Sequence, residues 1–156
     1  WGAVLRTTNG GQDWAAAPNA PAGNHNATFF LNAQTGFLVG PGAVHRTTNG
    51  GADWTTTVFP INEFQNLSTA FNAIHFGDAN HGWAVGSDGL MASTRDGGDT
   101  WELVFNPVQN PFDPPTPRLT HLPLTAVQFV AADTGWAVGA SGMVLRFGAA
   151  PVAAPV

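Results

Sequence analysis

Short apolar runs alternate with Gly, Asn, Asp and Pro along the whole chain. Three of these runs end at a phenylalanine, at Phe30, Phe76 and Phe129. Six residues after each Phe a glycine opens a second apolar run, at 36–40, 82–86 and 135–139. A third run follows after another turn, as in "AVHRT" at 43–47. Short runs bounded by turn residues are typical of β-strands, and no stretch has helical periodicity. The pattern predicts an all-β chain.

One eight-residue segment, which we call the box, follows the third run. It reads "TTNGGQDW" at 7–14, "TTNGGADW" at 47–54 and "TRDGGDTW" at 94–101. The box tryptophans are 40 and 47 residues apart, and a further short run follows each of them. Four short strands in each unit of this length indicate the four-stranded blades of a β-propeller.

The residue types of the box favour a structural turn over chemistry. The side chain of Asn or Asp can accept hydrogen bonds from backbone N–H groups just ahead of it, and Thr can add a hydroxyl. Glycine supplies positive φ angles, and a buried Trp removes about 200 Å² from water. The residues with these roles are Thr7, Asn9, Gly11, Trp14, Thr47, Asn49, Gly51, Trp54, Thr94, Asp96, Gly98 and Trp101.

The box, Ser/Thr-x-Asp/Asn-x-Gly-x-x-Trp, resembles the Asp box of the BNR repeats in bacterial sialidases and related propellers. The coupling of "GWAVG" to the box is similar to the photosystem II assembly and stability factor family and its uncharacterised bacterial relatives. This resemblance covers nearly the whole chain, apart from 106–123 and the residues after Arg146. It implies a non-catalytic propeller that binds other protein subunits, as an assembly factor or accessory subunit of a membrane complex.

The repeat divides the chain into a partial propeller, 1–148, and an Ala/Pro-rich tail or linker, 149–156. Within the propeller we expect a half blade at 1–21 and blades at 22–60, 61–106 and 107–148, the last with a Pro-rich insertion at 106–123. Closed propellers have at least about four blades. We therefore expect part of a longer propeller, or open sheet edges that pair with another chain.

Three arginines occupy equivalent positions, each two residues after a valine. They are Arg6, Arg46 and Arg146, while the third unit has Ser93 there. The family resemblance implies an arginine-rich face that binds a partner, which makes these residues candidates for partner binding. The alternative is that each arginine satisfies carbonyl groups at the end of its own strand.

The insertion at 106–123 interrupts the repeat and holds two further candidates for partner binding, Phe112 and Arg118. Its prolines favour a stiff, extended segment that could be presented to a partner. A passive surface loop is the alternative.

Charge and cysteine content exclude several function classes. Charged residues make up 10% of the chain, the net charge is -5, and all five basic residues are arginines spread along the sequence. Such a chain has no basic stripe for nucleic acid. Cysteine is absent, and no apolar run is long enough to span a membrane as a helix. Low charge with many Asn, Thr and Gly favours a location outside the cytoplasm, in the periplasm, the thylakoid lumen or on the cell surface.

Catalytic residues are scarce, so we expect no enzyme activity. A sialidase needs a Tyr nucleophile paired with Glu. The chain has no Tyr, and its only glutamates are Glu63 and Glu102. The alternative is a carbohydrate-active surface protein, either a glycan-binding module or a sialidase-like hydrolase whose site lies outside this chain. The five histidines lack metal-ligand spacing, and we expect neither metal nor cofactor.

Overall fold

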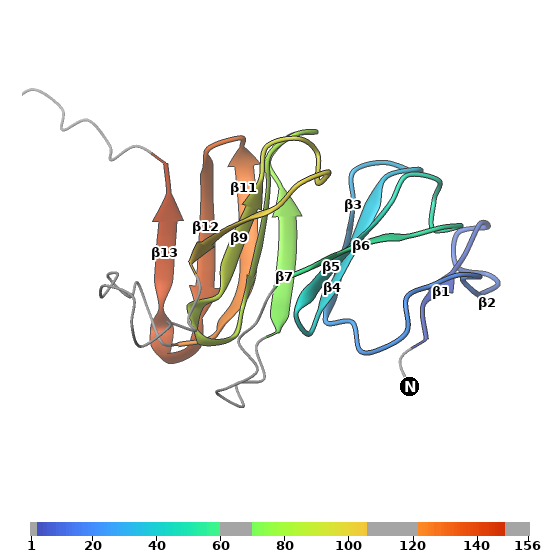
Figure 1. Ribbon diagram of the computed structural model, residues 1–156, viewed down its shortest axis with the longest axis horizontal. Coiled ribbons are helices and arrows are strands. Elements are labelled where there is room, and N and C mark those ends of the chain that lie inside the picture. Colours follow the sequence, from blue (N-terminus) through green and yellow to red (C-terminus); the bar gives the residue numbers. More distant parts are fainter. Residues whose placement is uncertain (1–2, 60–69, 106–121, 149–156) are drawn as a thin grey trace, which may run out of the picture.

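The computed structural model describes residues 3–59, 70–105 and 122–148, which form thirteen strands in four antiparallel sheets. The predicted all-β class is confirmed. In Figure 1 the sheets follow one another along the long axis of the molecule, from the β1–β2 hairpin at one end to β13 at the other. Helical geometry among the described residues is limited to two short 3-10 turns, Ser87–Gly89 and Ala140–Gly142.

Each sheet is a simple meander, in which neighbouring strands follow one another in the sequence. The first sheet is the hairpin of β1 (Leu5–Arg6) and β2 (Ala15–Ala16). The second contains β3 (Ala27–Phe30), β4 (Gly36–Gly40), β5 (Ala43–Thr47) and β6 (Thr55–Val58). The third contains β7 (Phe71–Phe76), β8 (Gly82–Gly86), β9 (Met91–Thr94) and β10 (Glu102–Phe105). The fourth contains β11 (Leu124–Ala131), β12 (Thr134–Gly139) and β13 (Val144–Phe147). Four strands per unit, as the repeat predicts, are present in the two middle sheets.

The spacing between Phe and Gly has a packing cause. Phe76 pairs with Gly82 across β7 and β8, and the ring of Phe76 lies directly over the glycine. A Cβ on Gly82 would come within 2.5 Å of that ring, which is closer than real contacts allow. The pairs Phe30–Gly36 and Phe129–Gly135 repeat this register. Only glycine leaves room for the ring, so the sequence spacing follows from the hairpin.

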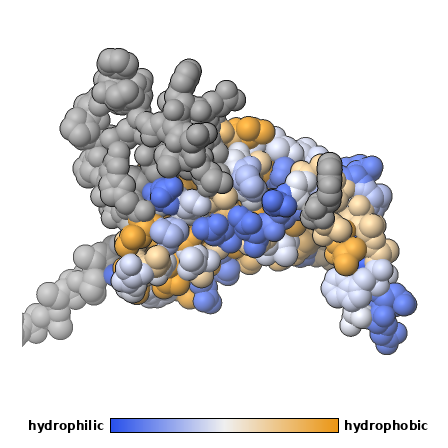
Figure 2. All heavy atoms as spheres, turned by 90° about the horizontal axis from the view of Figure 1, so that it is seen from below, coloured by the Kyte–Doolittle hydropathy of each residue, from blue (hydrophilic) through white to orange (hydrophobic). Residues whose placement is uncertain are grey.

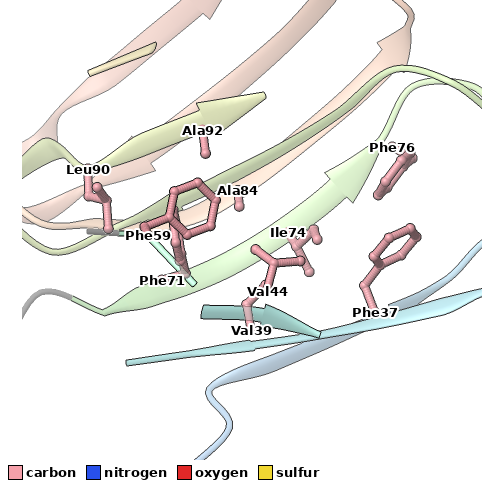
Figure 3. Close-up of a cluster of buried hydrophobic side chains, with 10 residues drawn as sticks. All are labelled: Phe37, Val39, Val44, Phe59, Phe71, Ile74, Phe76, Ala84, Leu90 and Ala92. Atoms are coloured by element: carbon pink, nitrogen blue, oxygen red, sulfur yellow. The ribbon is translucent and has the colours of Figure 1, made fainter. Parts of the chain in front are cut away.

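The largest core cluster lies between the second and third sheets. Figure 3 shows Phe37, Val39 and Val44 of β4 and β5 facing the side chains of β7, where Ile74 and Phe76 lie. The rings of Phe37 and Phe76 stack with their centroids 4.5 Å apart. Because no side chain of this cluster is more than 6% exposed, the two sheets share one dry interface.

A second cluster joins the third and fourth sheets. Trp83 of β8 stacks on Phe129 of β11 with a centroid distance of 5.4 Å and contacts Phe147 of β13 at 4.7 Å. Val85 and Met91 belong to the same cluster and are fully buried. From the second sheet to the fourth, neighbouring sheets are thus joined by aromatic side chains that one sheet packs against the next.

The expectation that every box tryptophan is buried holds only in part. Trp101 packs against the largest core cluster, where it contacts Phe37 and Phe76. Trp14 is 61% exposed, so the expectation is wrong for the first box. Trp14 lines a cavity of about 550 Å³ between the β1–β2 hairpin and the second sheet, so its ring lies beside open space rather than against packed side chains.

The surface is of mixed polarity. The face seen in Figure 2 intersperses hydrophilic and hydrophobic residues, and Val58, Val130 and Val144 are each more than 60% exposed. Single exposed apolar side chains of this kind are normal on soluble proteins. Within the described ranges no helix has the length and apolar character that a membrane crossing requires.

Candidate functional site

The three boxes are closed by the same hydrogen bonds. In the second box the Thr47 hydroxyl accepts the N–H of Gly51 at 2.8 Å and donates to Oδ1 of Asn49 at 3.0 Å. That Oδ1 also accepts the N–H of Asp53 at 2.9 Å. The first and third boxes repeat these three bonds at 2.8 to 3.0 Å. The Thr hydroxyl and the Asn or Asp side chain of each box are therefore bonded within the box itself, as in a structural turn.

In the third box, Asp96 takes the place of the asparagine and accepts the same hydrogen bonds. Oδ1 of Asp96 accepts the N–H of Thr100 at 2.9 Å, and Oδ2 accepts the Thr100 hydroxyl at 2.5 Å. These bonds, with the side-chain bond from Thr100 the most important, lower the pKa of Asp96 to about 2. A carboxylate held ionised in this way is poorly suited to act as a general acid.

The arginine candidates occupy the same register position in three separate sheets. Arg46 on β5 lies opposite Phe37, and Arg146 on β13 lies opposite Trp136. Arg6 is at the corresponding place on β1, while Ser93 lies opposite Trp83 in the third sheet. Arg6 and Arg146 are exposed, and Arg46 is half-buried. The three residues are therefore equivalent by repeat but lie on different sheets.

Arg46 makes a contact that neither sequence interpretation includes. Its Nη1 lies 2.7 Å from Oδ1 of Asp99, which belongs to the box of the next sheet. Its Cδ lies beside Gly98 of that box, and its Nε is buried without a partner among the described residues. Arg46 thus links β5 of the second sheet to the box of the third sheet.

Arg6 reaches toward the next box in the same manner, but the acid that Arg46 contacts has no counterpart at that position. Its guanidinium lies beside Gly50, and the position equivalent to Asp99 is Ala52. It lines a cavity of about 550 Å³ between the β1–β2 hairpin and the second sheet, which we call the hairpin cavity. The other main lining residues are Trp14, Phe30, Leu38, Gly51 and Trp54.

A second, more polar cavity of about 450 Å³ contains Arg46, Asp78 and Asp96. Its carboxylates are already bonded: Oδ1 of Asp78 accepts the N–H groups of Asn80 and His81 at 2.8 and 2.7 Å. The backbone N–H of His81, followed by that of Asn80, lowers the pKa of Asp78. Among the described residues no group of three His, Asp or Glu side chains could hold a metal ion.

Two asparagines that the sequence analysis did not single out connect successive sheets. Nδ2 of Asn26 donates to the carbonyl of Phe71 at 2.9 Å, and Nδ2 of Asn72 donates to the carbonyl of Leu124 at 2.9 Å. Each asparagine stands four residues before the Phe that ends its strand. That shared spacing was the signal available in the sequence.

His75 lies where three sheets meet. Its ring contacts Phe29 of β3 at a centroid distance of 4.8 Å, and its Nδ1 accepts the N–H of Phe129 of β11 at 3.1 Å. A nitrogen that accepts cannot carry a proton, so the bonded imidazole is neutral. Burial lowers the pKa of His75 below 6.5, and burial followed by the charge of His25 lowers that of His45.

Acid is therefore expected to destabilise the fold. Unfolded His75 binds a proton more readily than folded His75, so its contribution is complete above pH 6.5 and is lost as the pH falls through its lowered pKa. Urea unfolding between pH 7.5 and 5.5 measures this loss. His75→Asn keeps an acceptor oxygen near the Phe129 N–H but does not titrate, so its stability should fall less steeply. Equal slopes for the two proteins would contradict the assignment.

Phe112 and Arg118, the candidates in the insertion, lie outside the described residues, as does Glu63. Glu102 is described and lies exposed on β10. The arginines therefore remain the candidates whose surroundings the structure defines.

Comparisons with known proteins agree on the fold. A family model described as "Photosynthesis system II assembly factor YCF48" matches residues 26–118. The curated relative "Photosystem II stability/assembly factor HCF136, chloroplastic" of Cyanidioschyzon merolae is 68% identical over 25 residues, which are 16% of this chain and 6% of that protein.

Solved structures show the same architecture at low identity. "YCF48 from Cyanidioschyzon merolae" matches with a TM-score of 0.61 and 19% identity over 92% of this chain and 43% of its own. "YCF48 bound to D1 peptide" matches with a TM-score of 0.58 and 22% identity, over 79% of this chain and 36% of its own. An ancestral GH74 enzyme matches with a TM-score of 0.67 and 20% identity, over 93% of this chain and 20% of its own. These matches confirm the propeller fold, and this chain spans less than half the length of each.

Proposed function

We propose, from the premise that this chain belongs to the photosynthesis system II assembly factor YCF48 family, that it is a non-catalytic β-propeller scaffold that binds another protein. The observation that carries the proposal is the family match over residues 26–118, which include both four-stranded sheets. This chain spans less than half the length of the family members of known structure, so we propose their kind of activity for it rather than take it over whole.

The partner we propose is a peptide segment of a membrane-complex subunit. One family structure is that of YCF48 bound to D1 peptide, which shows that a relative with this fold binds a peptide. The described part of this chain offers two exposed arginines at equivalent positions, Arg6 and Arg146. Arginine is suited to such a role because its planar guanidinium forms paired bonds with carboxylates and carbonyls. We further propose a location outside the cytoplasm, since the curated relative is described as chloroplastic.

The alternative of a carbohydrate-active protein has less support. The likeness to the GH74 enzyme, at 20% identity, concerns the fold alone. Glu102 is the only described glutamate, and the box acid Asp96 is fully bonded. We therefore keep the proposal that this chain is not an enzyme.

We also propose partner binding by Phe112 and Arg118. We further propose that the chain divides into blades at 1–21, 22–60, 61–106 and 107–148, followed by a tail at 149–156. The support for this division is the repeat itself, together with the two-, four-, four- and three-stranded sheets found among the described residues.

The test is binding of the D1 peptide to the purified chain, measured by calorimetry at low and at high salt. The double variant R6Q/R146Q should weaken binding at least ~10-fold, because hydrogen bonds to charged groups contribute about 1.5–3 kcal/mol each. The control is Arg95→Gln, an exposed arginine in the third box that lies off this register. R46Q is kept separate because it also breaks the link to Asp99.

Equal affinities for wild type and R6Q/R146Q would remove the arginines from the proposal. No binding of the peptide by wild type would remove the peptide as partner of this chain. Added salt should weaken wild-type binding more than that of the double variant, because screening acts on exposed charges.

A further inference from the structure

The interface between the second and third sheets contains a seat for one aromatic ring. Phe37, from β4, rests in it and is fully buried. The seat is formed by three residues of the third sheet: Phe76 stacks on Phe37, Trp101 meets its edge at a centroid distance of 6.3 Å, and Gly98 lies beneath it. A Cβ on Gly98 would overlap the Phe37 ring. Glycine is thus required under the ring.

The next interface uses the same arrangement. Trp83 occupies on β8 the place that Phe37 occupies on β4, since both follow the first glycine of their strand. Trp83 stacks on Phe129, which corresponds to Phe76. In the second and third sheets, the second strand therefore supplies the aromatic ring that packs against the following sheet.

The second sheet carries the same seat on its other side, facing the β1–β2 hairpin. Phe30, Gly51 and Trp54 correspond to Phe76, Gly98 and Trp101, and all three line the hairpin cavity. No described residue fills it. A Cβ on Gly51 would meet only Trp54 within 4 Å, and Phe30 is 45% exposed where Phe76 is 4% exposed.

Next to the cavity, β1 also has an edge on which no described strand is hydrogen-bonded. In the second sheet β5 is paired on both sides, with β4 placing Phe37 opposite Arg46. In the described structure β1, the equivalent of β5, pairs only with β2. An antiparallel strand on the free edge of β1, with its aromatic residue opposite Arg6, would bring that ring to the position of Phe37.

We propose that the hairpin cavity binds the aromatic side chain of an extended segment with the sequence glycine–aromatic–aliphatic–Val–Gly, which adds as a strand to β1. This pattern occurs three times in the chain, at 36–40, 82–86 and 135–139, each time as the second strand of its sheet. The occupant is thus a second strand of a repeat unit of this type. Arg6 is among the lining residues of the cavity, but the proposal rests on the seat of Phe30, Gly51 and Trp54 and on the edge of β1, so it extends the proposed function rather than restating it.

The experiment uses a synthetic peptide of residues 32–42, Asn-Ala-Gln-Thr-Gly-Phe-Leu-Val-Gly-Pro-Gly, added to the whole chain. Trp14 and Trp54 line the cavity, so tryptophan fluorescence reports filling. We expect saturable binding that weakens at least ~10-fold when the peptide's phenylalanine is alanine, since the ring carries most of the buried area. Phe30→Ala in the protein should weaken binding similarly.

Val58→Ala is the matched protein control, because Val58 is 71% exposed on β6 and does not line the cavity. A peptide with benzoylphenylalanine in place of phenylalanine should crosslink to lining residues. Equal binding of the two peptides, no binding by wild type, or crosslinks to the edges of β10 or β13 would each overturn the proposal. A dimer that shields the cavity, and that the peptide does not dissociate, would also overturn the proposal. None of these results depends on the D1 peptide, so the two proposals fail separately.

Discussion

Replacing Phe37 by alanine is expected to lower the free energy of unfolding by about 3–5 kcal/mol, the usual cost of removing a buried aromatic ring. Phe37 is fully buried and contacts Phe76 and Trp101 of the next sheet. Gly98 beneath the ring has no side chain that could move into the space. The cavity should therefore persist, and the loss would be a large fraction of the stability of a typical domain, about 5–15 kcal/mol.

Phe30→Ala is the matched control, because it makes the same chemical change in the same sheet at a ring that is 45% exposed. Its loss should be less than half that of Phe37→Ala, since a half-exposed ring gives up less transfer free energy. Urea unfolding followed by circular dichroism measures both. Comparable losses would show that the seat of Phe37 does not join the second and third sheets as described.

The sequence predicted most of what repeats. The period of the apolar runs identified the strands, and the six-residue step from Phe to Gly reflects a cross-strand pair in which the ring needs a glycine opposite it. Both are local features, determined by residues a few positions apart. Periodicity reads such features directly because each hairpin closes within its own segment.

What the sequence did not predict is where one unit touches the next. Arg46 is one of three equivalent arginines, but its partner Asp99 is a box residue replaced by Ala52 one unit earlier. Trp14 is 61% exposed although Trp101, at the equivalent position of the third box, packs against Phe37 and Phe76, because burial depends on the neighbouring sheet. Contacts between sheets involve residues about 50 apart, and no local pattern determines them.

Replacing Thr47 by valine is expected to cost about 2–3 kcal/mol, although the two side chains have nearly the same shape. The Thr47 hydroxyl is the acceptor for the buried N–H of Gly51 and also contacts the N–H of Asn49 at 3.3 Å. Valine would leave these donors without an acceptor, and each unsatisfied buried group costs about 1–3 kcal/mol. Thr47 is 1% exposed, so water cannot take the place of the hydroxyl.

Thr7→Val tests this reasoning within the same protein, because Thr7 makes the same bonds in the first box. Its hydroxyl accepts the N–H of Gly11 at 2.9 Å, but that group is exposed. Water can then satisfy the N–H, and the loss in urea unfolding should stay below about 1 kcal/mol. If both substitutions cost the same, burial would not be what makes the second box important. If neither had an effect, the box hydrogen bonds would contribute little, and the stability of the turn would rest on its glycines and its tryptophan.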